Sequence, residues 1–515
     1  MADCNKFKET IESGYNCKGE CIVMGAAMLD GAAVEGLQVK APLKTFNRHG
    51  LIAGATGTGK TKTLQVIAEQ LSAQGVPVLM MDIKGDLSGI AQPGKTNPAI
   101  EERHAKIGAE WKASESTVEF LSLSKENGVR MRATVSEFGP VLFSKILGLN
   151  DVQEGVVSIV FKYCDDKKMP LLDLKDFKKV MNYLTGDGKK EIEENYGKIS
   201  TATTSTILRN IIELEQQGAE RFFGEKSFEV EDLVRIDENG RGVISILRLT
   251  DIQDKPKLFS TFMLSLLAEI YATFPEEGDA GRPKLVIFID EAHLIFEEAS
   301  KALLDQIETI IKLIRSKGVG IFFCTQNPAD VPDDVLAQLG MKVQHALRAF
   351  TAKDRKQIKL TAENYPLTDF YDTETLLTSL GMGEALVTVL NEKGIPTPLA
   401  ATLLQAPRSR MDVLTPQEID TINNQSKLVK KYEEVIDRES AFEILNGKLN
   451  AAVASPINAT SQNTNVNTPI SNEPSMVEKG VGALGDFAKS SAGKTIIREV
   501  TRGLLGVLGL GGRRR

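Results

Sequence analysis

Apolar runs that end abruptly in polar residues recur along the chain, separated by segments with a helical spacing of apolar positions. Five runs stand out, at residues 50–54, 76–82, 242–249, 284–290 and 318–326. Runs without polar alternation are typical of parallel strands buried on both faces of a sheet. After the first run, residues 61–71 place apolar side chains at positions 64, 67, 68 and 71, the spacing of one helix face. The pattern predicts an α/β fold with a mainly parallel sheet.

The segments outside these runs predict the remaining organisation. Hairpins are expected at residues 19–45, 116–135 and 383–404, and helices at residues 139–217 and 426–449. We therefore divide the chain into a small N-terminal β lead-in (1–45), the first half of a core (46–138), a helical insertion (139–235), the second half of the core (236–410), a C-terminal helical segment (411–450), a disordered linker (451–478) and a basic amphipathic tail (479–515).

Composition places the chain among ordinary soluble globular proteins. Of its 515 residues 42% are hydrophobic and 25% charged, and a formal net charge of −7 argues against a uniformly basic coat while allowing a local basic lining. No signal-peptide core and no run of roughly 18 apolar residues is found, so we expect a cytoplasmic protein without a transmembrane segment. Cys4, Cys17 and Cys21 are interpreted as reduced thiols rather than zinc ligands, and Cys164 and Cys324 as core residues.

The C-terminal tail has a charge balance of its own. Residues 479–515 hold eight basic residues against Asp486 and Glu499, which gives a local charge of +6. Such a tail could bind nucleic acid, dock on a protein partner or touch a membrane surface, and the sequence leaves these three open.

The first apolar run leads into the phosphate-binding motif G-x-x-x-x-G-K-[ST]. Its residues are Gly54, Ala55, Thr56, Gly57, Thr58, Gly59, Lys60 and Thr61, followed by Lys62. Glycines leave backbone N–H groups free to surround an anion, and the following helix adds its positive dipole end. Lys60 is expected to bridge the outer phosphates and Thr61 to ligate Mg²⁺. Because a strand precedes the motif and a helix follows it, these nine residues predict a nucleotide site.

The run at residues 284–290 ends in paired carboxylates, Asp290 and Glu291. We expect Asp290 to hold Mg²⁺ through water and Glu291 to polarise the attacking water, a pairing that hydrolysis requires and phosphate binding alone does not. His293 could couple this pair to a substrate, although a capping or packing role is as well supported.

The strand expected at residues 76–82 ends in a second polar group. In a doubly wound sheet the ligand crevice lies beyond the carboxyl ends of the strands, so Asp82, Lys84 and Asp86 would lie near the nucleotide or near whatever the protein grips. Turn and cap chemistry explains the same residues equally well.

Further candidates follow the last run. Gln326, after Thr325, is placed to contact the γ-phosphate or its attacking water. The stretch Asn327-Pro-Ala-Asp330 lacks the lysine of the guanine-reading motif, so we predict ATP as the nucleotide. Arg315 and Arg348 are candidate arginine fingers that would reach the γ-phosphate of a neighbouring subunit.

Gly54 to Thr61, Asp82 to Gly89, Asp290-Glu291 and Thr325-Gln326 occur in an order that resembles the HerA/FtsK superfamily of ring-forming P-loop ATPases. The likeness covers most of residues 20–410 and is nearest to the stand-alone bacterial HerA-like helicases of the YjgR type. It implies a RecA-like core, a homo-hexameric ring, and ATP-driven movement of double-stranded DNA through the pore.

The resemblance also implies that Arg315 is the leading finger, because it follows the carboxylate strand by the expected helix. Only about 45 residues precede the core, where HerA itself carries a nuclease-binding barrel. Two other functions remain open: a P-loop ATPase that remodels protein partners without nucleic acid, and a non-catalytic nucleotide-gated scaffold, which Glu291 argues against.

Overall fold

The computed structural model describes residues 4–454 apart from residues 124, 279, 297–300, 435 and 437. The contacts divide the chain into two compact units. Unit 1 comprises residues up to 132 together with 216–222 and 226–435, and unit 2 comprises residues 133–215, 223–225 and the chain from 436 onward. The linker and tail expected at residues 451–515 lie almost wholly outside the described residues, which end at 454.

Unit 1 is built on one sheet. Within the described residues this sheet has twelve strands. They are β1 (Cys21–Leu29), β2 (Ala32–Pro42), β3 (Gly50–Ala53), β4 (Val78–Asp82), β5 (Val118–Ser122), β6 (Val129–Arg130), β7 (Ile244–Arg248), β8 (Leu285–Ile289), β9 (Val319–Thr325), β10 (Met341–Gln344), β11 (Glu384–Thr388) and β12 (Ala400–Leu404). Their order across the sheet is β2-β1-β12-β11-β10-β3-β9-β8-β4-β7-β5-β6.

The sheet changes character at β10. From β10 to β6 every neighbouring pair is parallel, whereas β2, β1, β12, β11 and β10 pair antiparallel. The central strands β3, β4, β8 and β9 are buried along their whole length, as their unbroken apolar sequences require. The α/β fold with a mainly parallel core is therefore confirmed.

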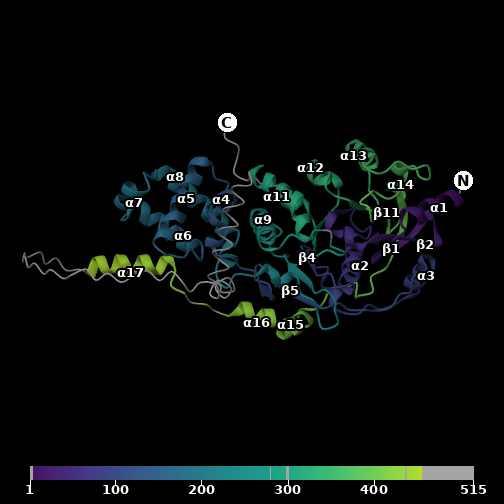
Figure 1. Ribbon diagram of the computed structural model, residues 1–515, viewed down its shortest axis with the longest axis horizontal. Coiled ribbons are helices and arrows are strands. Elements are labelled where there is room, and N and C mark those ends of the chain that lie inside the picture. The colour runs from purple at the N-terminus through teal and green to yellow at the C-terminus, as the bar shows by residue number, and fades with distance from the viewer. Residues whose placement is uncertain are drawn as a thin grey trace, which may run out of the picture. The chain divides into compact units, whose positions relative to one another are not determined.

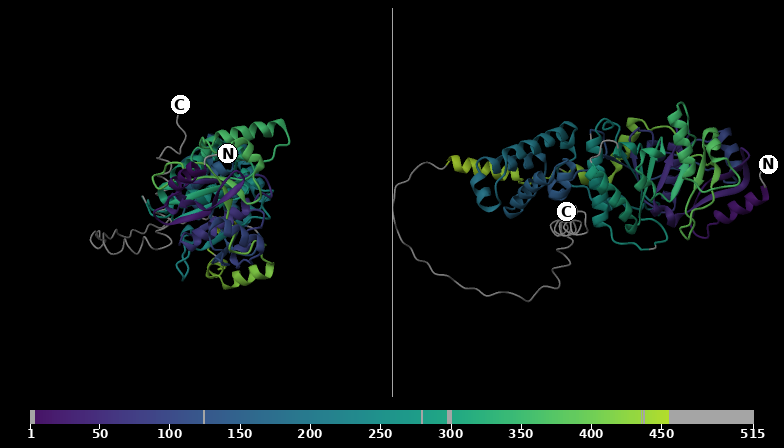
Figure 2. Two further views of the ribbon diagram at one scale, coloured as in Figure 1. Left: turned by 90° about the vertical axis from the view of Figure 1, so that its right-hand side faces the viewer. Right: turned by 90° about the horizontal axis from the view of Figure 1, so that it is seen from above.

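Helices cover both faces of this sheet. They are α1 (Cys4–Gly14), α2 (Lys60–Ala73), α3 (Pro98–Ile107), α9 (Pro256–Thr273), α10 (His293–Phe296), α11 (Lys301–Ile314), α12 (Asp333–Leu336), α13 (Ala352–Glu363), α14 (Thr373–Ser379), α15 (Pro416–Gln425) and α16 (Lys427–Glu433). Figures 1 and 2 show α9 and α11 on one side of the sheet and α15 and α16 on the other. Leu64 and Ile67 of α2 pack in one core with Met80 and Phe288.

Unit 2 is helical in its described part. It holds α4 (Val135–Ile146), α5 (Asp151–Asp166), α6 (Leu174–Thr185), α7 (Lys189–Asn195), α8 (Thr201–Gln216) and α17 (Ala441–Ala454), which gather in a bundle in Figure 1. Phe143 and Phe177 pack at its centre, with ring centroids 4.9 Å apart. Helices α4 and α5 begin at capping boxes made by Thr134 and Asn150.

Two of the predicted elements are wrong. Residues 116–135 do not form a hairpin, because β5 and β6 pair parallel, Leu121 with Val129. The helix expected at residues 426–449 is interrupted: α16 ends at Glu433, and Ser440 caps a new helix by accepting Phe442 N–H at its Oγ. The hairpins at residues 19–45 and 383–404 are confirmed as the antiparallel pairs β1–β2 and β11–β12. No helix in the described part of the chain is long and apolar enough to cross a membrane.

Candidate active site

The strands that carry the predicted motifs end together at one edge of the sheet. Ala53 pairs with Thr325 and Ile289 with Phe323, so the residues that follow β3, β8 and β9 emerge side by side. Asp82 ends β4 at the same edge, because Met81 pairs with Ile289. We call this the nucleotide edge. Parallel strands impose this convergence, which brings distant motifs into one site.

The phosphate-binding loop joins β3 to α2. Gly54, Gly57 and Gly59 adopt positive φ angles of 150°, 79° and 111°, which side chains disfavour. Gly59 is the N-cap of α2 and no side chain caps this helix end. The first N–H groups of α2 therefore meet no capping side chain, which is the arrangement that binds an anion.

His345, which the sequence analysis did not single out, lies beneath the loop. Its Nδ1 donates to Thr58 O at 3.1 Å, and its Nε2 lies 2.9 Å from Thr63 Oγ1. A Cβ at Gly54 would come within 2.5 Å of His345 Cβ. Burial, and secondly the charge of Lys60, lower the pKa of His345 to about 4. The ring is thus neutral and supports the loop through one donor and one acceptor.

Lys60 lies inside the loop. Its Nζ donates to Gly54 O at 2.7 Å and to Ala55 O at 3.2 Å. Burial lowers the pKa of Lys60, and the nearby charge of Lys84 lowers it further. A buried ammonium beside a second cation favours a polyanion as its partner.

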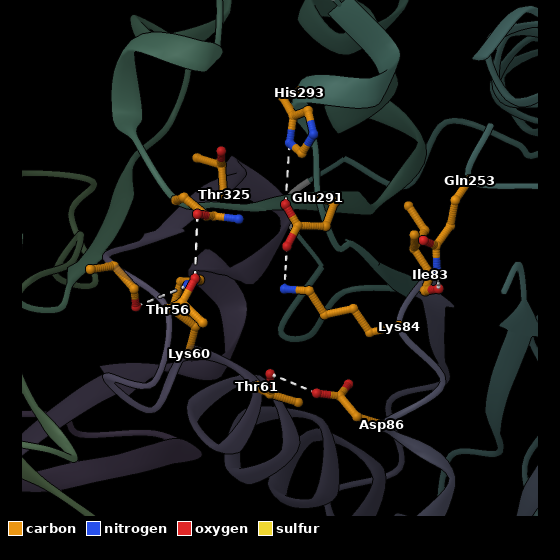
Figure 3. Close-up of polar contacts among 12 residues, drawn as sticks. Thr56, Lys60, Thr61, Ile83, Lys84, Asp86, Gln253, Glu291, His293 and Thr325 are labelled. Carbon is orange, nitrogen blue, oxygen red and sulfur yellow. Dashed lines mark hydrogen bonds and ion pairs between the residues drawn. The ribbon is translucent and has the colours of Figure 1, made fainter. Parts of the chain in front are cut away.

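The carboxylates after β8 are both buried. Asp290 Oδ2 has no hydrogen-bond partner among the described residues, and burial raises the pKa of Asp290 to about 6. Glu291 has a φ of 46°, in the left-handed region that non-glycine residues rarely adopt. Its carboxylate lies between two side chains: Lys84 Nζ pairs with Oε1, and His293 Nδ1 lies 3.2 Å from Oε2 (Figure 3).

The sequence left two roles open for the charged residues after β4, capping of the turn and a place near the nucleotide, and the structure contains both. Asp82 caps the turn by accepting Gly85 N–H at 2.8 Å and Leu87 N–H at 3.2 Å. Asp86 instead faces the nucleotide edge, where its Oδ2 accepts from Thr61 Oγ1 at 3.3 Å. Lys84 pairs with Glu291, as Figure 3 shows. Lys84 and Asp86 therefore belong to the site, and Asp82 positions the turn that carries them.

Gln326 extends from the end of β9 toward the loop. It is exposed, and its Oε1 accepts from Thr56 Oγ1 at 3.4 Å. Thr325 is instead used locally, since its hydroxyl donates to Asp330 Oδ2. Asn327 accepts Ala329 N–H within the same turn. The polar residues after β9 thus divide into Gln326, which faces the loop, and a turn that holds it in place.

The side chain of Lys62 lies away from the phosphate loop. Its Nζ donates to Met411 O at 2.5 Å. Lys62 is one of the nine residues predicted to bind nucleotide, but its side chain bonds a residue outside the nucleotide edge. Met411 belongs to residues 405–414, which we call the strap. The strap runs along α2, where Glu69 accepts from Arg408 N and Ser409 N at 2.8 and 3.1 Å.

The two candidate arginines lie at opposite edges of the sheet. Arg348 follows β10 at the nucleotide edge, two residues after Ala346, whose carbonyl accepts Ala55 N–H at 2.8 Å, and it donates to Thr378 O at 3.2 Å. Arg315 precedes β9, so the seven-residue strand, about 20 Å long, separates it from the loop of its own subunit. It is exposed beside a cavity of about 470 Å³ that Arg48, Lys312 and Lys342 also line.

The residues at the nucleotide edge fit a magnesium nucleotide. The buried, unpartnered Asp290 Oδ2 is an oxygen ligand of the kind Mg²⁺ prefers, and the free start of α2 suits a phosphate chain. In the described part of the chain no three His, Cys, Asp or Glu side chains are grouped to hold a metal by themselves.

A RecA-like core with this edge defines a P-loop ATPase. The sequence matches the family described as Helicase HerA-like C-terminal over residues 28–515, and the chain belongs to that family. It is an ATP hydrolase that uses ATP and Mg²⁺. The predicted resemblance to the HerA/FtsK superfamily is thereby confirmed.

Individual relatives are distant. The chain is 23% identical over 385 residues to the DNA double-strand break repair helicase HerA of Saccharolobus solfataricus, covering 74% of this chain and 68% of the relative. It is 24% identical to the DNA import protein CedB of Sulfolobus acidocaldarius, but spans only 51% of that protein. The solved structure of the plasmid coupling protein TrwB with the ATP analogue ADPNP matches with a TM-score of 0.51 at 15% identity, covering 80% of this chain and 95% of TrwB, a likeness of fold alone.

Proposed function

We propose that this ATPase couples hydrolysis to movement on double-stranded DNA, and that it does so as a homo-hexameric ring. Membership of a helicase family supports the coupling, and the names of two relatives, a repair helicase and a DNA import protein, support DNA as the substrate. The net charge of −7 is compatible with this role if the contact with DNA is local.

The nucleotide edge supplies a residue for each part of the chemistry. Lys60 would bridge the outer phosphates, and the Thr61 hydroxyl and Asp290 would hold Mg²⁺. Glu291 orients the attacking water and accepts its proton. Gln326 contacts the γ-phosphate or that water, from a position where it already reaches Thr56. Hydrolysis would then alter contacts of the turn after β9.

The observation that carries the ring is the separation of Arg315 from its own nucleotide edge. An arginine about 20 Å from the loop along β9 can stabilise a γ-phosphate only if that phosphate belongs to another subunit. A cyclic assembly gives every subunit such a neighbour. Arg348 lies at the nucleotide edge of its own subunit, which favours Arg315 as the finger in trans.

The test is ATP turnover with and without DNA, together with images of the particles. We expect double-stranded DNA longer than about 30 base pairs to stimulate turnover and single-stranded DNA to do so less. Negative-stain images with ADPNP should show six-fold rings. If neither kind of DNA changes the rate of ATP turnover but a protein partner does, the remodelling function that the sequence left open replaces this proposal.

A further inference from the structure

Lys84 is a second lysine of the nucleotide edge that the phosphate-loop motif does not contain. It lies on the turn after β4, its side chain is 38% exposed, and its ammonium is paired with the Glu291 carboxylate. Burial alone would lower the pKa of Lys84, but the ion pair with Glu291 and the charge of Asp290 raise it. Lys84 is therefore charged and partly open to solvent.

Two ammonium groups converge on this site. After burial, the charge of Lys84 is the strongest influence on the pKa of Lys60, which it lowers. The same charge lowers the pKa of Asp290 more than any other nearby charge does. Figure 3 shows Lys84 extending toward Glu291 above the start of α2. Two cations held close together repel each other, and a polyphosphate placed between them would remove that repulsion.

The turn that carries Lys84 is held at three points. Asp82 caps it from within, Asp86 accepts from Thr61 in the first turn of α2, and Gln253 donates to Ile83 O at 2.6 Å. The backbone of Lys84 is thus fixed relative to the phosphate loop, while its long side chain keeps rotamer freedom. This combination allows the ammonium to move between partners while the backbone stays in place.

We propose that Lys84 exchanges the Glu291 carboxylate for the γ-phosphate when ATP binds. Without a γ-phosphate the ammonium stays on Glu291, where it neutralises the group that must accept a proton from water. With ATP the ammonium moves to the terminal phosphate, and Glu291 becomes free to orient the attacking water. The inference rests on the role proposed above for Glu291 and adds to it a residue that distinguishes ATP from ADP.

The exchange predicts a change in nucleotide preference that a purely structural ion pair would not cause. ADP lacks the group that Lys84 contacts, so Lys84→Met should weaken binding of Mg·ADPNP about tenfold, as expected for a lost charge-assisted hydrogen bond, and leave Mg·ADP within about twofold. Lys84→Arg keeps the charge and should retain most of the preference. The measurement is titration calorimetry without DNA, so its outcome does not depend on whether the protein translocates.

Two controls separate this role from loss of an ion pair in general. Lys106→Met removes another paired lysine, bonded to Glu102 on the surface of α3, and should change neither affinity. Glu291→Gln removes the competing carboxylate, so it should tighten ADPNP but not ADP, and Lys84→Met in that background should lose more ADPNP affinity than it loses in the wild type. Melting temperatures verify that each variant is folded.

The outcomes are decisive in both directions. A selective loss of ADPNP affinity in Lys84→Met, with retention in Lys84→Arg, supports the exchange. An unchanged ratio of ADPNP to ADP affinity in folded Lys84→Met overturns it and leaves Lys84 as a structural partner of Glu291. An equal loss of both affinities also overturns it, because it places the ammonium on a phosphate that ADP shares.

Discussion

The two edges of the parallel sheet differ in how they are built. At the nucleotide edge, residues that follow four strands are joined to one another and to the phosphate loop by hydrogen bonds and by the ion pair of Lys84 with Glu291. At the opposite edge, Arg315 lies beside Arg48, Lys312 and Lys342 in a cavity of about 470 Å³. At the nucleotide edge carboxylates and lysines lie together and pair with each other, whereas four cationic side chains gather at the opposite edge.

This difference indicates what each edge lacks. The nucleotide edge has the residues proposed as base, metal ligand and phosphate cradle, but its own arginine, Arg348, is bonded to Thr378 O. The opposite edge offers an exposed arginine without a nucleotide. The two edges become complementary if subunits meet one edge against the other, which is the heterologous contact that generates rings.

The largest effects should come from the nucleotide edge. Lys60→Ala should lose nucleotide affinity and hydrolysis together, because its ammonium is proposed to bridge the phosphates. Glu291→Gln should bind ATP and stall, with turnover lower by about 10²–10⁴, the range for loss of a general base. Calorimetry and a phosphate-release assay separate the two defects, and wild-type turnover in Glu291→Gln would remove this residue from the mechanism.

The second effect tests whether the edges of neighbouring subunits cooperate. Arg315→Ala should lower turnover on the order of 10³ and spare ATP binding, as expected of a finger in trans. Mixed with Lys60→Ala subunits it should regain activity, because a mixed interface pairs an intact Lys60 with an intact Arg315.

Arg348→Ala is the matched control for this experiment. If Arg348 acts on the nucleotide of its own subunit, mixing with Lys60→Ala restores nothing, since each site then lacks one of the two residues. The opposite result would be rescue with Arg348→Ala and no rescue with Arg315→Ala, in oligomers shown to be mixed. It would make Arg348 the finger in trans and remove that role from Arg315.

A moderate effect is expected beneath the phosphate loop. His345→Ala leaves Thr58 O without its donor, and losing such a buried hydrogen bond costs about 1–3 kcal/mol. Nucleotide affinity should fall about tenfold and the melting temperature by several degrees. His104→Ala is the control, because His104 is also buried and bonds Ala109 O and Ala406 N away from the loop. A fall in melting temperature without a selective fall in affinity would limit His345 to packing.

The smallest effect should be that of Lys62. Because its ammonium bonds Met411 O, Lys62→Met is expected to change ADPNP affinity by less than about threefold. The contrast with Lys60→Ala, two residues away, is measured in the same titration. A loss of tenfold or more would show that Lys62 turns to the phosphates when nucleotide binds.

The sequence predicted those parts of the site whose chemistry is contained in a short stretch. Gly54 to Thr61 can bind phosphate only if a strand precedes the loop and a helix follows it. Asp290-Glu291 is recognisable as a site motif because an apolar run precedes it. Apolar runs also predicted the parallel strands, because burial on both faces leaves no polar alternation. Local pattern and tertiary position coincide at these residues.

Other residues depend on partners that no local pattern reveals. His345 is 282 residues from Thr63, and Lys84 meets Glu291 only because β4 and β8 are neighbours. The parallel direction of the β5–β6 pair depends on the course of the chain between the two strands, which strand propensity does not determine. The break after α16 reflects the cap at Ser440 in a stretch of helical periodicity. One signal was available: three residues of mixed charge, Asp82, Lys84 and Asp86, follow one another closely at a strand end.

The strap has a consequence for how the protein is made. Ser409 binds Glu69 across 340 residues of chain, and Gly89 packs so closely against it that a Cβ would meet Asp412 O at 2.1 Å. At about 5–20 residues per second, the ribosome needs roughly 17–70 s to supply the strap after α2 has emerged. Until then Gln65 and Glu69 of α2 lack the hydrogen bonds that the strap supplies, so this side of the helix stays hydrated. An ATPase whose phosphate-loop helix is completed by the strap can become competent only after residue 414 has been synthesised.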